Sequence, residues 1–513
     1  MRAFVSVLII VFCLLAAQPV RTVTAKDTWT SMRSRNYVLI GNAREEDIRT
    51  MAVQLERFRD IFTRQFKGAA LNSPVPTTVI VFKSDSSFGP YKPRFRGRRV
   101  DVAGYFQSGF DMNYITLSAE PRRQYNPYEM IFHESVHLLV DNKVRTSPAW
   151  FNEGLAEYFS ALDFVPEKTG GGKLVVFGKP ILRHILMLRQ KQLLPLVTLF
   201  GVDRTSPYYN EREKSGMFYA QSWALMHYLT HGQAGQRQPQ LARFLELLAS
   251  GNPLAQSFQQ AFESDYATLE KELNEYVRQD KYRGTFVPYV EPADSDRELK
   301  SVPLTEAQAL AYLGDLLLHY DRGDEAEKHL RQALALSPEL SAANASLGML
   351  RVHQRDFVAA KEHLQRAMKG DPQNYLAQYY YAYALSSEPM DQQQTVTGYA
   401  PETAAQMRTA LTRAMEIAPG FPETYRLLAF VNLITNTRLD EAVTLLEHAL
   451  TLSPGRHEFS YVLAQVHSRR KNYKAASVIL EQVIAGNPNP QMRALAQEML
   501  ETVRLREKYQ PKE

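Results

Sequence analysis

The chain has 513 residues, which is too long for one hydrophobic core and predicts several domains. Its 60 Lys and Arg residues exceed its 55 Asp and Glu residues by only five, a balance that argues against a nucleic-acid partner. The only cysteine is Cys13, so internal disulfides cannot stabilise the fold.

The first 25 residues have the pattern of a secretory signal. Arg2 precedes an apolar run from Ala3 to Ala17, and a short polar stretch ends at Ala25. This pattern predicts export to the periplasm or the extracellular space, with cleavage of residues 1–25. The apolar run is shorter than a membrane-spanning helix requires, so we expect membrane attachment only if this segment stays uncleaved.

Residues 26–289 carry mixed α and β patterns, which predict an α+β domain. Three apolar, β-branched runs predict strands, at residues 35–42, 77–84 and 112–118. Apolar residues at helical spacing predict helices at residues 45–66, 216–231 and 238–280. Residues 290–304 are polar and punctuated by proline, which is typical of a linker.

Beyond residue 304 the sequence repeats itself. Prolines recur with spacings of 34, 47, 35 and 34 residues, at positions 338, 372, 419, 454 and 488. Gly or Ala recurs at equivalent places in at least four of the five units, which lets paired helices pack closely. The pattern resembles the tetratricopeptide repeat family and implies an all-α solenoid of five repeats over residues 305–489, with an insertion at about 386–402. Residues 490–513 are expected to form a capping helix and tail.

The segment that begins at residue 127 contains the candidate metal-binding residues. Asn126 before Pro127 predicts a helix start. The helix places His133 and His137 four residues apart on one face, with Glu134 beside them. Two imidazoles on one helix face can bind a single metal ion.

A second helix adds carboxylates. Ser147 before Pro148 predicts its start, and Glu153 and Glu157 are four residues apart on one face. Two neutral imidazoles and one carboxylate leave the fourth position of a tetrahedral Zn²⁺ ion for water, which is the arrangement of a catalytic site. Glu134 can take a proton from this water and pass it to a leaving amine.

The elements HESVH and WFNEGLAEYF resemble those of gluzincin metallopeptidases, in particular the peptidase MA-like group related to aminopeptidase N. The resemblance implies a zincin-like metallopeptidase domain at residues 26–289, zinc as the cofactor, and a peptide or protein as the substrate. On that match the metal ligands are His133, His137 and Glu153, and Glu134 is the general base.

Glu153 and Glu157 compete for the third ligand position. Fifteen residues separate Glu153 from His137, fewer than is usual in the resembled group, and nineteen separate Glu157 from it, a thermolysin-like spacing. A metal-bound histidine normally donates its other N–H to a carboxylate. If Glu153 binds zinc, Glu157 can orient His133, whereas Ala161, one turn after Glu157, can orient nothing. We therefore favour Glu153 as the ligand.

The resemblance bears on three further features. It implies that Tyr219, in FYAQSWALMHYL, stabilises the oxyanion, with His227 and His231 as weaker alternatives. It implies that the strand at residues 112–118 is an edge strand along which an extended substrate aligns. No amine-binding acidic element of the aminopeptidase type precedes the HESVH helix, which favours an endopeptidase.

The sequence thus predicts an exported zinc-dependent peptidase whose repeat domain binds substrate or a partner protein. Two alternatives stay open. One is a non-catalytic repeat scaffold with a relic metal domain, and the other is a zinc hydrolase of non-peptide bonds.

Overall fold

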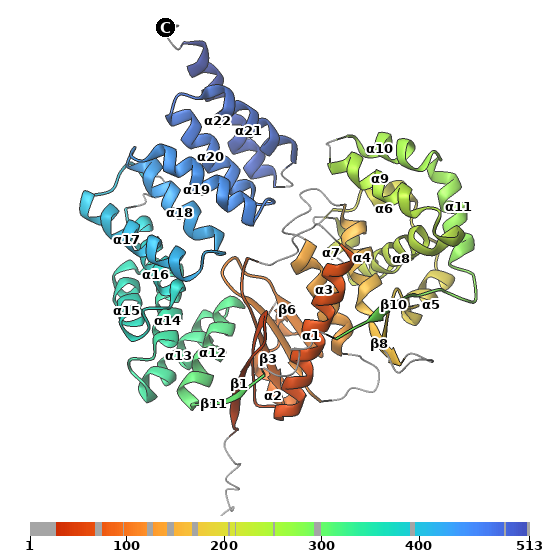
Figure 1. The fold of residues 1–513 in the computed structure, drawn as a ribbon, viewed down its shortest axis with the longest axis horizontal. Helices are drawn as coiled ribbons and strands as arrows, with labels where there is room; N and C mark the ends of the chain where they lie inside the picture. The colour runs from red at the N-terminus through yellow and green to blue at the C-terminus, as the bar shows by residue number, and fades with distance from the viewer. Residues whose placement is uncertain are drawn as a thin grey trace, which may run out of the picture.

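The computed structural model describes residues 27–66, 74–95, 97–120, 127–140, 148–166, 173–203, 206–210, 212–249, 252–291, 299–389, 396–486 and 489–509. The expected signal segment and the expected caps Asn126 and Ser147 lie outside these ranges. Along the chain, a mixed sheet is followed by a helical unit and then by a curved array of helix pairs (Figure 1). Within the described ranges, no helix is both long and apolar enough to cross a bilayer.

A six-stranded sheet forms the N-terminal body, in the order β11-β1-β2-β3-β7-β6. Its centre, β2, β3 and β7, is parallel, and the other three strands join antiparallel to their neighbours. The strands are β1 (Trp29–Arg33), β2 (Tyr37–Gly41), β3 (Thr77–Phe82), β6 (Gly104–Gln107), β7 (Asn113–Ser118) and β11 (Ser301–Leu304). The short elements between β3 and β6 are α2 (Asp85–Phe88), a 3-10 turn (Gly89–Tyr91), β4 (Arg94–Phe95) and β5 (Arg98–Arg99).

Both faces of this sheet are covered, which explains the continuous apolar runs of its central strands. Leu39 and Val79 pack with α1 (Glu45–Gln65), the helix expected between the first two predicted strands. Their neighbours Ile40 and Ile80 point to the opposite face and pack with α12 (Glu306–His319). The first helix of the repeats therefore completes the core of the N-terminal body.

Two expectations about this sheet are wrong. Residues 301–304, expected in a linker, form strand β11, which pairs with β1 from Leu304 opposite Trp29. Edge pairing uses backbone groups, and Val302 stays 57% exposed, so the side-chain pattern does not reveal the strand. The predicted edge strand at 112–118 is interior, because β7 lies between β3 and β6. The edge strand next to β7 is β6, whose four residues are too few to show a period-two pattern.

The second body is helical and has an aromatic core that includes Trp150, Phe159, Trp223 and Phe244. Its helices are α3 (Pro127–Val140), α4 (Ala149–Ser160), α5 (Leu182–Gln190), α6 (Leu196–Phe200), α7 (Pro207–Asn210), α8 (Arg212–His231), α9 (Gln238–Ala249), α10 (Leu254–Phe262) and α11 (Tyr266–Tyr276), with a 3-10 turn at Gly232–Gly235. A three-stranded sheet flanks them, formed by β8 (Asp163–Pro166), β9 (Lys173–Phe177) and β10 (Thr285–Tyr289).

Two helix boundaries in this body differ from expectation. Helix α4 begins at Ala149, with Pro148 in the preceding extended position. The single helix expected at 238–280 is three helices, because Pro253 precedes a new start and the Asp265 side chain accepts a hydrogen bond from the Thr268 N–H to cap another.

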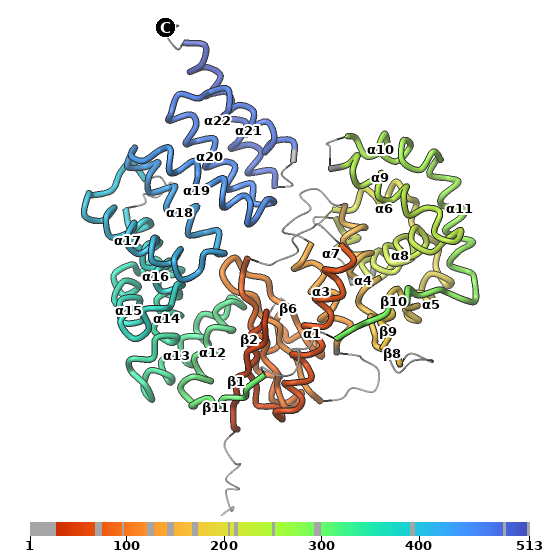
Figure 2. Tube along the Cα trace, viewed as in Figure 1, coloured from red at the N-terminus to blue at the C-terminus, as the bar shows by residue number. Residues whose placement is uncertain are grey.

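The C-terminal body contains the five expected helix pairs and a final helix. The pairs are α12 and α13 (Gly323–Leu336), α14 (Ser341–His353) and α15 (Phe357–Gly370), α16 (Tyr375–Ser387) and α17 (Pro401–Ile417), α18 (Pro422–Ile434) and α19 (Leu439–Leu452), and α20 (His457–Arg469) and α21 (Tyr473–Gly486), followed by α22 (Pro490–Lys508). A Cβ on Gly348 would lie 2.5 Å from Leu364, so close packing of the pair requires the small residue. Figure 2 shows the array rising beside the sheet and ending above it.

A buried network joins the sheet to the repeats through Asp111, in the hairpin between β6 and β7. Asp111 is 1% exposed, accepts a hydrogen bond from the Tyr380 hydroxyl of α16, and lies 3.1 Å from His319 Nε2 of α12. Asp315 of α12 accepts a hydrogen bond from the Tyr114 hydroxyl of β7. Burial lowers the pKa of His319, but the two aspartates outweigh burial and raise the pKa to about 9. The hairpin is therefore fixed against the first three repeats.

Candidate metal centre

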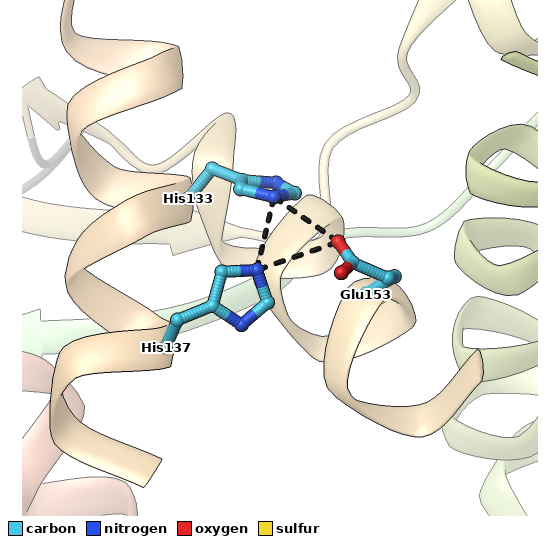
Figure 3. Close-up of side chains that lie close together, drawn as sticks. All are labelled: His133, His137 and Glu153. Atoms are coloured by element: carbon cyan, nitrogen blue, oxygen red, sulfur yellow. Dashed lines mark hydrogen bonds and ion pairs between the residues drawn. The ribbon is translucent and has the colours of Figure 1, made fainter. Parts of the chain in front are cut away.

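Helices α3 and α4 bring the three expected ligands together, and Figure 3 shows His133, His137 and Glu153 pointing toward one another. The two Nε2 atoms are 3.2 Å apart. Glu153 Oε2 lies 3.2 Å from His133 Nε2 and 3.3 Å from His137 Nε2. Ligand atoms around a tetrahedral zinc ion are about 3.3 Å from one another, because each lies about 2.0 to 2.1 Å from the ion. The three atoms have the spacing that one such ion requires.

The charge of the cluster also fits a cation. Glu153 is 2% exposed, and no residue in the described ranges donates a hydrogen bond of good geometry to its Oε2. Burial raises the pKa of Glu153, but His133 and His137 outweigh burial and lower it. Burial lowers the pKa of His133, but Glu153 and Glu157 raise it to about 9. The raised pKa of His133 indicates that a proton on histidine compensates the buried carboxylate, and a metal ion held by these three residues would replace that proton.

Glu157 lies on the other side of His133. Its Oε1 is 3.6 Å from His133 Nδ1, and its Oε2 is 3.1 Å from His184 Nε2 and 3.5 Å from the Arg183 guanidinium. Burial raises the pKa of Glu157, but His184 and His133 outweigh burial and lower it. The structure thus places Glu153 at the Nε2 atoms of the histidines and Glu157 beside Nδ1 of His133.

The two expected catalytic side chains lie beside the cluster. Glu134 lines the same cleft as His137, and burial raises the pKa of its carboxyl group. A raised pKa suits a residue that must accept and return a proton near neutral pH. The ring of Tyr219, on α8, is 6.2 Å from the ring of His133, and burial together with Glu153 raises the pKa of its hydroxyl.

Two neighbours of the cluster were not predicted. The Tyr209 hydroxyl of α7 donates a hydrogen bond of 2.7 Å to Glu153 Oε1, and His184 of α5 contacts Glu157. Each is a single residue in a short helix without a motif, so no sequence signal marks it. The weaker alternatives to Tyr219 are hydrogen-bonded elsewhere: His227 Nε2 donates to the Gly178 carbonyl, and His231 pairs with the Tyr158 hydroxyl.

A cleft of about 360 Å³ opens at the cluster and has three walls. The edge strand β6 and its hairpin contribute Tyr105 to Phe110. Helices α3 and α4 contribute Glu134, His137 and Glu153. The repeats contribute the third wall, with Pro422, Ser453 and Arg456. The candidate metal centre is thus enclosed by both halves of the chain.

Comparison with protein families gives two partial matches. A tetratricopeptide repeat model matches residues 433–499, and a model described as a protein of unknown function (DUF1570) matches residues 129–255. The second match spans the whole cluster, from His133 to Tyr219, and its description names no activity. The C-terminal body is therefore a tetratricopeptide-repeat solenoid, a kind of fold whose concave surface commonly binds proteins. A search of proteins with curated descriptions finds no match.

Of three solved structures similar to this chain, two are described as TPR proteins. YrrB, described as a TPR protein with an unusual peptide-binding site, is 18% identical with a TM-score of 0.31 and covers 37% of this chain and 92% of its own. PilF of Pseudomonas aeruginosa is 16% identical with a TM-score of 0.31, and the match covers 40% of this chain and 93% of PilF. A thermophilic TPR protein of Thermus thermophilus is 17% identical, with a TM-score of 0.31 and coverage of 39% and 99%.

Proposed function

We propose that this chain is a zinc-dependent peptidase of the gluzincin type. The observation that carries the proposal is the convergence of three ligand atoms at tetrahedral spacing, with Glu134 beside them in a cleft. Two imidazole nitrogens and one carboxylate oxygen are a donor set that zinc commonly takes in catalytic sites. A purely structural zinc site has four protein ligands and needs no carboxyl group with a raised pKa beside it.

In the proposed reaction each side chain has one task. His133, His137 and Glu153 would hold zinc, which when bound acidifies a water molecule and polarises the substrate carbonyl. Glu134 accepts a proton from the attacking water and donates it to the leaving amine. Glu157 holds the His133 ring in place through Nδ1, and the Tyr219 hydroxyl donates a hydrogen bond to the oxyanion.

The cleft favours an endopeptidase that binds an extended chain. The outer edge of β6 lies along the cleft, and an edge strand can pair with the backbone of a peptide without reading its sequence. Among the described residues that line the cleft, the only acids are Glu134 and Glu153. Both already have proposed roles, so no further carboxylate among the described residues that line the cleft is available to hold a free amino terminus.

One experiment tests this proposal. The full chain is purified, its zinc is counted, and a mixed peptide library is incubated with wild type, Glu134→Gln and the surface control Glu246→Gln. We expect about one zinc per chain in all three proteins, and cleavage at least about 100-fold slower in Glu134→Gln only. Bound zinc without cleavage by the wild type would contradict the peptidase.

A second candidate function is a repeat scaffold whose metal domain is non-catalytic. The match to the tetratricopeptide repeat model favours it, because such repeats bind proteins. Hydrolysis of esters by the same ligands is a further alternative, and ester substrates in the same assay separate it from peptide hydrolysis. We also propose that the chain is exported, on the pattern of residues 1–25, and N-terminal sequencing of the mature protein tests this.

A further inference from the structure

The repeat wall of the cleft is formed where the fourth and fifth helix pairs meet. Pro422 is the first residue of α18, Ser453 directly follows α19, and Arg456 directly precedes α20. These residues line the same cavity as Glu134 and His137. Because the Asp111 network fixes the first repeats to the sheet and the pairs stack continuously, this wall has a defined position opposite the candidate metal centre.

Arg456 is the only lysine or arginine among the described residues that line the cleft. Its guanidinium is held in place, since it donates a hydrogen bond of 2.6 Å to Glu423 Oε1 and lies 5.0 Å from the centre of the Phe459 ring. Glu423 is 3% exposed and also accepts a bond of 2.6 Å from Arg426. One buried carboxylate thus accepts hydrogen bonds from two guanidinium groups, which holds the Arg456 side chain in place.

A second carboxylate contacts Arg456 from the solvent side. Arg456 Nε donates a hydrogen bond of 3.3 Å to Glu458 Oε2, and the Glu458 side chain is 53% exposed. Solvent screens such a contact, so it holds the guanidinium much less firmly than Glu423 does. A ligand in the cleft can replace Glu458 without disturbing the buried pair.

We propose that Arg456 binds a carboxylate of the substrate and is thereby a specificity-determining residue of the cleft, an inference that rests on the proposed function. Arginine presents several N–H donors in a plane, which matches the two oxygens of a carboxylate. Its guanidinium is already oriented by Glu423, so less side-chain entropy is lost on binding. The carboxylate belongs either to an acidic side chain or to the C terminus of a peptide.

Peptide binding to the full chain tests the proposal. Three fluorescent pools of randomised decapeptides are used: an acid-free pool with amidated ends, the same pool with one glutamate, and the acid-free pool with a free C-terminal carboxylate. Fluorescence anisotropy is measured with the Glu134→Gln chain, so that no peptide is cut. We expect one carboxylate pool to bind about tenfold more tightly than the neutral pool, as a charge-assisted hydrogen bond provides. The pool that binds more tightly identifies the source of the carboxylate.

Variants in the same background assign this preference to Arg456. Arg456→Gln is expected to remove it while leaving the affinity for the neutral pool within about twofold, and Arg456→Lys to keep part of it. Glu458→Gln, which removes the competing carboxylate, is expected to increase it. The matched control is Arg413→Gln, because Arg413 pairs with Glu416 on α17 and does not line the cleft.

The outcomes separate this inference from the proposed peptidase. Equal affinity for the three pools, no binding of any pool, or a preference that survives Arg456→Gln would overturn the inference even if the wild type cleaves peptides. If the wild type cleaves nothing but its carboxylate preference depends on Arg456, the peptidase is wrong and the inference stands. The Glu458→Gln result decides the case in which Arg456→Gln fails to fold.

Discussion

Two carboxylates, one in each half of the chain, are buried to almost the same degree but are compensated in different ways. Glu423 of the repeats is 3% exposed and accepts hydrogen bonds of 2.6 Å from two arginines. Glu153 of the candidate metal centre is 2% exposed and faces two imidazoles and one tyrosine hydroxyl. Arginine is always charged, whereas histidine is charged only while it holds a proton. Arginines of the fold compensate the charge of Glu423, whereas the charge of Glu153 is compensated by a histidine proton that a metal ion, bound as proposed, would replace.

The strongest test of this contrast is removal of each charge in turn. Glu153→Gln is expected to lower zinc affinity by at least about 1000-fold, because loss of a ligand costs more than the 10- to 100-fold that loss of an orienting residue costs. Competition with a zinc-binding dye measures the affinity. Glu423→Gln should leave zinc affinity unchanged, and an equal loss in both variants would break the comparison.

The reverse order is expected for stability. Glu423→Gln leaves two partly buried arginines beside an uncharged group and should lower the free energy of unfolding by about 3 kcal/mol. The apparent midpoint of urea unfolding measures this loss. The control is Glu416→Gln, which removes an exposed ion pair and should change stability by less than about 1 kcal/mol. A similar effect of both variants would show that the fold does not depend on the buried pair.

The interdomain network sharpens the comparison, because there a histidine compensates buried aspartates without a metal. The pKa of His319 is raised from 6.5 to about 9, so its contribution to stability is complete below pH 6.5 and is lost as the pH rises through 9. This loss is at most about 3 kcal/mol. Urea midpoints measured between pH 6 and 9 should fall more steeply for wild type than for His319→Gln. Parallel pH profiles for wild type and His319→Gln would contradict the assignment of this pH dependence to His319.

Glu157→Gln is expected to have the smallest effect of the four. It keeps three metal ligands but weakens the contact of 3.6 Å that orients His133 through Nδ1. Zinc affinity should fall about 10- to 100-fold, clearly less than in Glu153→Gln. The same dye competition measures it. If Glu157→Gln lost more zinc than Glu153→Gln, the assignment of ligand and orienting residue would be reversed.

Features that depend on local spacing could be predicted from the sequence. His133 and His137 share a helix face because they are four residues apart, and Glu153 follows on the next helix. The five helix pairs follow from a proline period near 34 residues, and the small residues fall where the paired helices touch. In each case the physical cause lies within one helix or between consecutive helices.

Features that depend on distant segments came only from the tertiary structure. β11 was hidden because edge pairing needs no side-chain pattern, and β6 rather than β7 lies at the open edge. Tyr209 reaches Glu153 from a short helix without a motif.

By itself the sequence predicted which residues could bind a metal and that a repeat solenoid follows them, because both depend on helical periodicity. Only the tertiary structure decided that the solenoid packs on the sheet, contacts the hairpin at Asp111 and lines the cleft with Arg456. These contacts join residues hundreds of positions apart, and packing of whole elements brings them together. The candidate active site is therefore a property of both halves of the chain.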